Sequence, residues 1–307
     1  MRKYATLASV SRRPAGHCGD PEARRQLREE TFLFLQRARR MGADLVAFPE
    51  VYPQLALSDP YAAIEPAEGG TLEDVREMAR DLGLYVVWPR FETSASGPRN
   101  SAVLVDRQGE VVGRYYKMFP TIGEIEKGIV PGTECPAFPT EFGTVAMAIC
   151  FDLNFIEVRE ALRPQRPDVV CFCSMYRGGV EVQTWAIDLG CYMVSAIAAE
   201  LGRIVDRGGG LLKLATYEAL ITQRVNLNQR QLHMDYNWDK MDAMLEKYGP
   251  RLTFDYYTQE ARYVIGYQGT DRDVDEILAE FGLEHITDYF ARARRVRREK
   301  LEACGLA

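Results

Sequence analysis

The chain has 307 residues, of which 38 are Lys or Arg and 44 are Asp or Glu, so its formal net charge is −6. A net negative charge argues against a general nucleic-acid or anionic-membrane binder, because such partners require a basic surface. The apolar fraction of 47% and the charged fraction of 27% are typical of a globular protein with a sizeable core.

Strand-like and helix-like runs alternate through the first half of the chain. Pro21 suits a first helical turn, and apolar residues recur at helical spacing behind it as far as Met41. Arg107-Gln108-Gly109 is a hairpin signal between two strand-like runs. We predict helices over Pro21–Met41 and Leu72–Leu82, and strands over Lys3–Val10, Asp44–Phe48, Leu84–Trp88, Ser101–Asp106 and Glu110–Tyr115.

The alternation continues to about residue 230 and then changes. Up to there we predict helices over Phe155–Leu162 and Val182–Leu189, and strands over Thr144–Ile149, Asp168–Cys173, Tyr192–Ala199, Gly202–Asp206 and Leu220–Val225, the last two around a Gly208-Gly209-Gly210 turn. Such alternation, with hairpins beside strand–helix units, predicts a layered α/β domain with mixed sheets. Beyond it we predict only helices, over Asn237–Tyr248, Arg272–Phe281 and the very basic His285–Glu302.

The domain organisation follows from this change of pattern. We expect one catalytic domain over residues 1–230 and a C-terminal extension, residues 231–307, that packs on that core or on a partner subunit. Met1–Val10 lacks the apolar run of a signal peptide, and seven cysteines occur without framework spacing, so we expect a cytoplasmic protein with reduced thiols. His17, His233 and His285 lack ligand spacing, which predicts no catalytic metal.

A thiol lies where a strand seems to pass into a helix. Cys150 ends the apolar run Val145–Ile149 and is followed by Phe151-Asp152-Leu153-Asn154. Helix N-terminal N–H groups would favour the thiolate there and could also hold an oxyanion. The alternative is a buried structural cysteine, which is the commonest fate of a free cysteine.

Two further charged residues follow predicted strands. Glu50 comes directly after Leu45–Pro49, and a carboxylate in a partly dry pocket can act as a general base. Lys117 follows the Glu110–Tyr115 strand, and its ammonium could stabilise an oxyanion. Each has a simpler alternative, a loop or capping carboxylate for Glu50 and a surface lysine for Lys117. Together with Cys150, however, they could carry out acyl transfer through a thioester.

The joint occurrence of these segments resembles the nitrilase superfamily of carbon–nitrogen hydrolases. The resemblance covers roughly residues 1 to 230, and the combination is more specific than any part. The matching stretches are Phe48-Pro49-Glu50, Gly113–Lys117, Pro131-Gly132 and Cys150–Glu157, with a weaker match over Trp185–Asp188.

The resemblance implies a role for each matching residue. Cys150 would be the nucleophile, and Glu50 the general base. Lys117 and the backbone N–H of Phe151 would hold the oxyanion. A second glutamate precedes the Pro131-Gly132 loop in many members, and Glu126 is preferred over Glu124 because its distance to that loop fits better.

Other residues bear on the substrate. Phe151-Asp152 after the cysteine resembles the amidase and carbamoyl-amide hydrolase branches more than true nitrilases. Tyr176 and Arg177 follow a strand end and could bind a substrate carboxylate, although an ordinary glycine turn explains them equally well. Trp185 and Asp188 stand where members often have Arg and Glu, which leaves the substrate open.

The resemblance also implies a fold and an activity. The fold would be a four-layer α-β-β-α sandwich of two mixed sheets with helices outside, in at least a dimer. We expect hydrolysis of a small-molecule amide or N-carbamoyl amide without a cofactor. Transfer of the acyl group to an amine and a non-catalytic binding or regulatory role are the alternatives.

Overall fold

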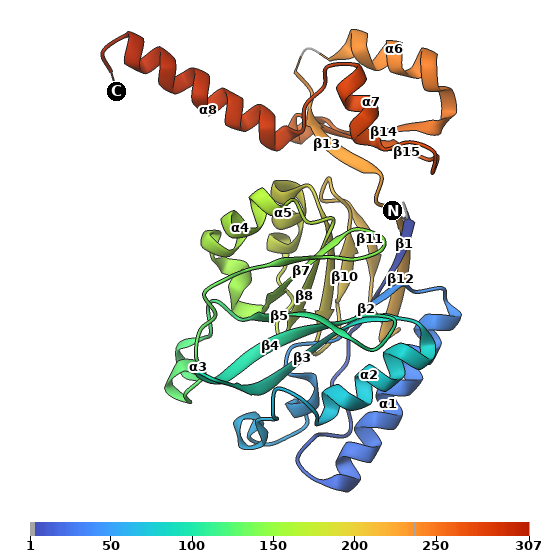
Figure 1. The fold of residues 1–307 in the computed structure, drawn as a ribbon, viewed down its shortest axis with the longest axis vertical. Coiled ribbons are helices and arrows are strands. Elements are labelled where there is room, and N and C mark those ends of the chain that lie inside the picture. Colours follow the sequence, from blue (N-terminus) through green and yellow to red (C-terminus); the bar gives the residue numbers. More distant parts are fainter. Residues whose placement is uncertain (1–3, 236, 307) are drawn as a thin grey trace. The chain divides into compact units, whose positions relative to one another are not determined.

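A computed structural model describes residues 4–235 and 237–306. The chain divides into two compact units, with the boundary between Val225 and Asn226. Each unit has a hydrophobic core of its own. In Figure 1 the colours run from blue to yellow through the first unit, and the second is orange and red.

The first unit contains two six-stranded sheets (Figure 1). In the first sheet the middle strands β1, β2 and β3 are parallel, whereas β3, β4 and β5 form an antiparallel meander. Its strands, in spatial order, are β12 (Leu220–Asn226), β1 (Tyr4–Val10), β2 (Leu45–Ala47), β3 (Tyr85–Ser94), β4 (Gly97–Val105) and β5 (Val111–Tyr116).

The second sheet has the same mixed character. Its middle strands β7, β8 and β9 are parallel, and β6, β10 and β11 pair antiparallel at the two edges. Its strands, in spatial order, are β11 (Leu211–Leu214), β10 (Arg203–Val205), β9 (Tyr192–Ile197), β8 (Val169–Ser174), β7 (Thr144–Ile149) and β6 (Ala137–Pro139).

Helices cover the outer face of each sheet. Helices α1 (Pro21–Arg40) and α2 (Thr71–Leu82) pack beside the first sheet, and α4 (Ile156–Leu162) and α5 (Val180–Leu189) beside the second. Strands of the two sheets contact each other through β1 with β9 and β4 with β7. The predicted four-layer α-β-β-α sandwich is therefore confirmed, and it explains why the central strands are buried on both faces.

Short helices connect these layers. Helix α3 (Ile122–Glu126) follows β5 and begins with a capping box in which Thr121 and Glu124 bond each other's backbone N–H. Single 3-10 turns occur at Tyr52–Gln54, Pro60–Ala63, Cys150–Asn154 and Arg163–Gln165, and in the second unit at Gly249–Arg251 and Thr258–Glu260.

The second unit is a three-stranded antiparallel sheet with helices. The strand order is β13 (Gln229–His233), β15 (Arg262–Tyr267) and β14 (Leu252–Tyr257). Its helices are α6 (Trp238–Tyr248), α7 (Val274–Glu280) and α8 (Ile286–Ala303). The central strand β15 is buried at every position after Arg262, so this unit has a sheet-based core that the sequence analysis, which predicted helices alone, missed.

One strand pairing also differs from the sequence prediction. The Gly208-Gly209-Gly210 turn joins β10 to β11, a strand that the sequence analysis did not predict, while Leu220–Asn226 pairs in the other sheet. The run Leu211–Leu214 is mostly exposed and therefore lacks the apolar alternation that marks a strand. Among the residues that the structure describes, no helix combines the length and apolar character needed to cross a bilayer.

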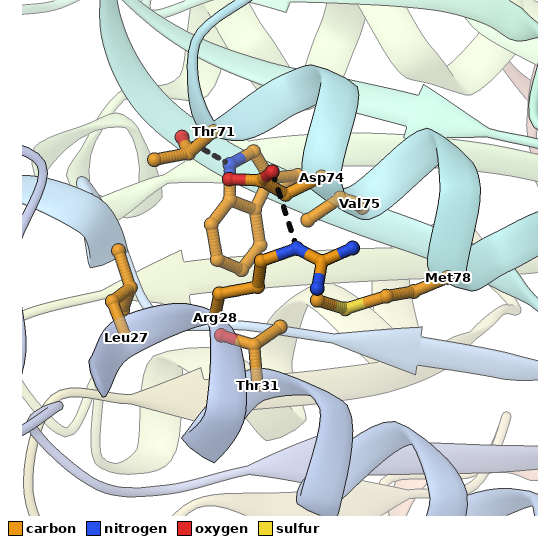
Figure 2. Close-up of a pocket in the computed structure, with 8 residues that line it drawn as sticks. Leu27, Arg28, Thr31, Thr71, Asp74, Val75 and Met78 are labelled. Carbon is orange, nitrogen blue, oxygen red and sulfur yellow. Dashed lines mark hydrogen bonds and ion pairs between the residues drawn. The ribbon is translucent and has the colours of Figure 1, made fainter. Parts of the chain in front are cut away.

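Trp88 on β3 joins the helical layer to the first sheet. Its Nε1 donates a hydrogen bond to Thr71 Oγ1 on α2 at 3.1 Å. Trp88 is among the residues that line a small cavity between α1 and α2. Arg28 and Asp74, which also line it, form an ion pair at 3.3 Å (Figure 2). The other contacts of Trp88 are edge-on with Phe48 and Tyr52, at ring distances of 5.1 and 5.5 Å.

We predict that Trp88→Phe lowers the free energy of unfolding of the first unit by about 1–3 kcal/mol. The change removes a buried hydrogen bond and leaves part of a ring volume empty. Urea unfolding followed by circular dichroism measures the loss. Trp238→Phe is the matched control, because Trp238 is 54% exposed and an exposed substitution changes stability by less than about 0.5 kcal/mol. Equal stability of the two variants would contradict the role of Trp88.

Candidate active site

Glu50 lies in the turn that follows β2. The turn is held from both sides, because the rings of Phe48 and Tyr52 pack on each other at 5.0 Å and on Trp88. Val51 adopts a left-handed conformation with φ of 43°, an uncommon one for a β-branched residue. Only 3% of Glu50 is exposed, so the aromatic turn holds a carboxylate inside the protein.

Lys117 follows β5 and is shared by two carboxylates. Its Nζ lies 2.8 Å from Glu50 Oε1 and 2.7 Å from Glu124 Oε2, and 1% of the residue is exposed. Burial lowers the pKa of Lys117, but the charges of the two carboxylates outweigh burial and raise the pKa above its usual value. The site therefore contains a permanently charged ammonium.

Asn100 on β4 links the same two carboxylates from another side. Its Nδ2 donates to Glu50 Oε1 at 2.9 Å and to Glu124 Oε1 at 2.7 Å. Burial raises the pKa of Glu124, but Lys117 and the hydrogen bonds from Thr121 and Asn100 lower it below its usual value. Sequence reasoning missed Asn100, because an asparagine inside a strand carries no signal of its own.

The structure places Glu124, and not the preferred Glu126, beside Lys117. Glu124 is 5% exposed and pairs with Lys117, whereas Glu126 is exposed and has no ion pair within the described ranges. The two residues are two positions apart on α3, and at about 100° per residue their side chains leave opposite sides of the helix. Distance along the chain to Pro131-Gly132 could not reveal which glutamate faces inward.

The Pro131-Gly132 loop packs against the backbone of Lys117. Gly132 N donates to Lys117 O at 2.8 Å. A Cβ on Gly132 would approach Tyr116 O to 2.1 Å, so only glycine fits this close approach. The loop thus holds the end of β5 from which Lys117 projects.

Cys150 occupies a strained junction after β7. Its φ is 48°, in the left-handed region, and the 3-10 turn Cys150–Asn154 begins there. Burial and, after it, the charge of Glu50 raise the pKa of the Cys150 thiol to about 12, although Lys117 partly opposes the rise. The expectation that helix N–H groups favour the thiolate is therefore wrong, because one short turn does not offset burial next to a carboxylate.

Asp152 joins the Cys150 segment to the Lys117 segment. Its carboxylate accepts hydrogen bonds from Tyr115 Oη at 2.7 Å, Phe119 N at 2.9 Å and Ile149 N at 2.9 Å. Burial raises the pKa of Asp152 to about 6, although these three donors oppose the rise. Since β5 and β7 belong to different sheets, this buried carboxylate connects the two sheets beside the site.

The predicted substrate-binding residues fall in different surroundings. Burial, and to a smaller extent the electrostatic effect of nearby Cys150, raise the pKa of the Tyr176 phenol to about 12. The backbone N–H of Met175 donates to Glu50 Oε2 at 3.2 Å, which ties this loop to the site. Arg177 is exposed. Phe151 is 36% exposed and packs edge-on against Phe155 at 5.0 Å.

The two departures from the expected pattern have structural roles. Trp185 Nε1 donates to Leu153 O at 3.0 Å and so supports the turn after Cys150. Asp188 pairs with Arg159 at 3.1 Å on the outer helices. Among the described residues, no contact joins either side chain to the charged cluster of Glu50, Lys117 and Glu124.

The arrangement can perform nucleophilic chemistry without a metal. It offers a thiol, a carboxylate within reach of that thiol, and an ammonium held beside both. Residues 4–235 and 237–306 contain no group of three His, Cys, Asp or Glu side chains able to hold a metal ion.

Comparison with known proteins gives a family match over most of the first unit. A family model described as carbon-nitrogen hydrolase matches residues 17–222. That range contains Glu50, Lys117, Glu124 and Cys150, and it ends before the second unit begins.

Several curated relatives are amidases. Deaminated glutathione amidase of Homo sapiens is 28% identical over 195 residues, which are 55% of this chain and 58% of that protein. The Bos taurus protein of the same name is 27% identical over 194 residues, with the same coverage. Omega-amidase NIT2 of Homo sapiens is 23% identical over 233 residues, 64% of this chain and 81% of that protein. The chain thus spans 58% of the length of the first two relatives.

Solved structures show the same fold. Nit3 of Saccharomyces cerevisiae, a member of branch 10 of the nitrilase superfamily, has a TM-score of 0.64 at 15% identity and covers 81% of this chain and 95% of its own. An amidase from Nesterenkonia sp. has a TM-score of 0.61 at 20% identity, covering 74% of this chain and 92% of its own.

We predict that Glu124→Gln lowers kcat by about 100-fold or more, whereas Glu126→Gln leaves it within about twofold of wild type. Glu124→Gln removes one of the two charges that hold the Lys117 ammonium, and Glu126→Gln changes an exposed side chain. Ammonia release from a substrate amide measures both. A larger loss in Glu126→Gln would overturn the assignment from geometry.

A second prediction concerns Asn100. Asn100→Leu keeps the shape and removes both donors, so kcat/KM falls about tenfold or more. The pKa of Glu124 rises when its donor is lost, so the acid limb of the pH–rate profile moves to higher pH. Ser101→Ala is the matched control, because Ser101 is buried on the same strand and donates instead to Arg90 O. If the acid limb of the pH–rate profile moved equally in both variants, the effect of Asn100 on the site would be one of packing alone.

Proposed function

This chain belongs to the carbon–nitrogen hydrolase family, in the amidase branch of the nitrilase superfamily, and we propose that it hydrolyses a small linear amide or N-carbamoyl amide through a thioester on Cys150. One observation carries the proposal: Glu50, Lys117 and Cys150, from three separate strand ends, meet in one buried cluster.

Acylation begins with a neutral thiol, because burial and Glu50 raise the pKa of Cys150. Sγ attacks the amide carbon while Glu50 takes the thiol proton, and the carbonyl electron pair moves to oxygen. Lys117 and the Phe151 backbone N–H hold this oxyanion. The C–N bond then breaks, protonated Glu50 gives its proton to the leaving nitrogen, and ammonia or an amine departs.

Deacylation reverses the proton transfers. Water attacks the thioester carbon while Glu50 accepts a proton from it, and the same groups hold the second oxyanion. The C–S bond breaks, the acid product leaves, and the Cys150 sulfur recovers its proton from Glu50. Glu50 therefore acts as base and acid in each half of the cycle.

Glu124 keeps the Lys117 ammonium charged and in position throughout this cycle. It holds the Lys117 ammonium at 2.7 Å, in addition to the contact of that ammonium with Glu50. When Glu50 becomes neutral during acylation, the attraction that held Lys117 to it weakens. A second carboxylate of lowered pKa keeps the ammonium in place and ionised at that moment.

The substrate class rests on three observations. Phe151-Asp152 follows the nucleophile, the matched relatives are named as amidases, and the described residues around Cys150 include one buried cation, Lys117. Tyr176 beside Cys150 and exposed Arg177 two residues after Met175 would bind the part of the substrate beyond the amide. Assembly as at least a dimer, a role for the C-terminal region in that dimer, and a cytoplasmic location stay predictions of the sequence.

We predict that brief incubation with amides and carbamoyl compounds gives a covalent mass adduct on wild type and none on Cys150→Ala, which also loses all turnover. Intact-protein mass spectrometry measures the adduct, and its mass gives the acyl group. Cys304→Ala is the matched control, because Cys304 is an exposed free thiol that would report non-specific labelling.

The outcomes separate the possible activities. Full activity of Cys150→Ala would refute the mechanism. An adduct whose acyl group passes to an added amine, in preference to water, would indicate an acyltransferase. Neither an adduct nor ammonia release from any compound would favour a binding protein on this fold.

A further inference from the structure

A strongly basic helix ends the second unit, outside the residues that the family model matches. Helix α8 carries six basic side chains within nine positions, Arg292, Arg294, Arg295, Arg297, Arg298 and Lys300, and three acidic ones, Asp288, Glu299 and Glu302. Its net charge is therefore +3. Since the whole chain has −6, the rest of the protein carries −9. The net charge of the whole chain predicts no nucleic-acid partner, but it does not reveal that basic residues are concentrated in α8.

Over the part of the chain that the structure describes, most of α8 lacks packing contacts that would support it. Ile286 is its one buried residue, and residues 291–300 are all exposed. Within the second unit, Figure 1 shows the helix extending away from its sheet beyond the first turns. Helices that are polar all round and unsupported by packing are only marginally stable in water.

Charge repulsion makes the free helix still less favourable. Arg294 has Arg297 and Arg298 three and four positions on, and Arg297 has Lys300 three positions on, all at like-charge spacings that destabilise a helix. The ion pairs within reach are Arg292 with Glu284 and Arg295 with Glu299 at 3.9 Å. In the described ranges no carboxylate pairs with the remaining four cations, so a polyanion would stabilise α8.

The positions of the cations around α8 indicate which kind of polyanion could contact all of them. At about 100° per residue, the six cations at positions 292, 294, 295, 297, 298 and 300 together lie on all sides of the helix. A flat acidic protein surface would meet one side only. Phosphates that line both walls of a groove would meet opposite sides, and the major groove of duplex DNA, about 12 Å wide, admits an α-helix.

Two other features of α8 argue against insertion into a membrane and against stacking on bases. Val296, at 53%, is the one large apolar residue exposed between positions 291 and 300, so α8 lacks the apolar face with which a helix inserts into a membrane surface. The aromatic residues at its start, Tyr289 and Phe290, pack on the ring of His233 and are not displayed for stacking on bases. Five of the six cations are arginine, the residue best suited to phosphate.

We propose that α8 is a sequence-independent binding element for the phosphate backbone of duplex nucleic acid. The hydrolase unit would then be retained at a nucleic acid through the C-terminal helix, although the rest of the protein carries a charge of −9. This proposal does not depend on the reaction at Cys150.

The test is fluorescence anisotropy of the full chain with a labelled DNA duplex at about 50 mM salt and above. The variant Arg294→Gln, Arg297→Gln, Arg298→Gln removes three cations and retains good helix formers. The matched control, Arg39→Gln, Arg40→Gln, Arg80→Gln, makes the same charge change at exposed positions of α1 and α2. Circular dichroism and ammonia release show that both variants fold.

Wild type should bind with an affinity that falls steeply with salt, because each phosphate neutralised on B-form DNA contributes about −0.9 to the slope of log K against log salt. The α8 variant should bind at least about tenfold more weakly, with a slope reduced by roughly 2.7 for three lost contacts. The control variant should match wild type.

Three results would overturn the proposal. One is no binding of wild type to the duplex at about 50 mM salt. Another is an equal loss in the control variant, which would indicate general charge attraction. The third is self-association that the α8 variant abolishes without any duplex binding by wild type, which would make a second copy the partner.

Discussion

One buried ammonium, that of Lys117, determines how the ends of several chain segments must meet. An ammonium this deeply buried costs several kcal/mol unless carboxylates compensate it. Glu50 from the turn after β2, Glu124 from α3 and, behind them, Asn100 from β4 provide the compensation. Removing any one of them leaves the others with an unpaired buried charge or donor, so the site is held together by the same interactions that make it reactive.

The proposed nucleophile, Cys150, joins this cluster from the other sheet. Asp152 fixes the distance between the Cys150 turn and the Lys117 strand end through three hydrogen bonds. In the resting protein the high pKa of Cys150 keeps the thiol protonated, and a neutral thiol is a poor target for oxidation. In the proposed mechanism the sulfur becomes a strong nucleophile only when Glu50 takes its proton, which would couple reactivity to the presence of a substrate carbonyl.

The two units divide the properties of the chain between them. The first contains the reactive cluster and the family match, and the second has its own sheet, its own core and the charge-segregated helix α8. A net charge calculated over the whole chain describes neither unit, since α8 is basic within an acidic protein. The family match lies within the first unit and does not extend into the second.

The sequence by itself predicted the layered fold, which the structure confirms, and proposed Glu50, Lys117 and Cys150 as candidate site residues, because buried strands and short motifs depend on neighbouring residues along the chain. Only the tertiary structure decided between Glu124 and Glu126, since that choice depends on which side of one helical turn faces β4. The tertiary structure alone also revealed Asn100, the Asp152 link and the high pKa of the thiol. These depend on burial and on charges from strands distant in sequence, which no local pattern records.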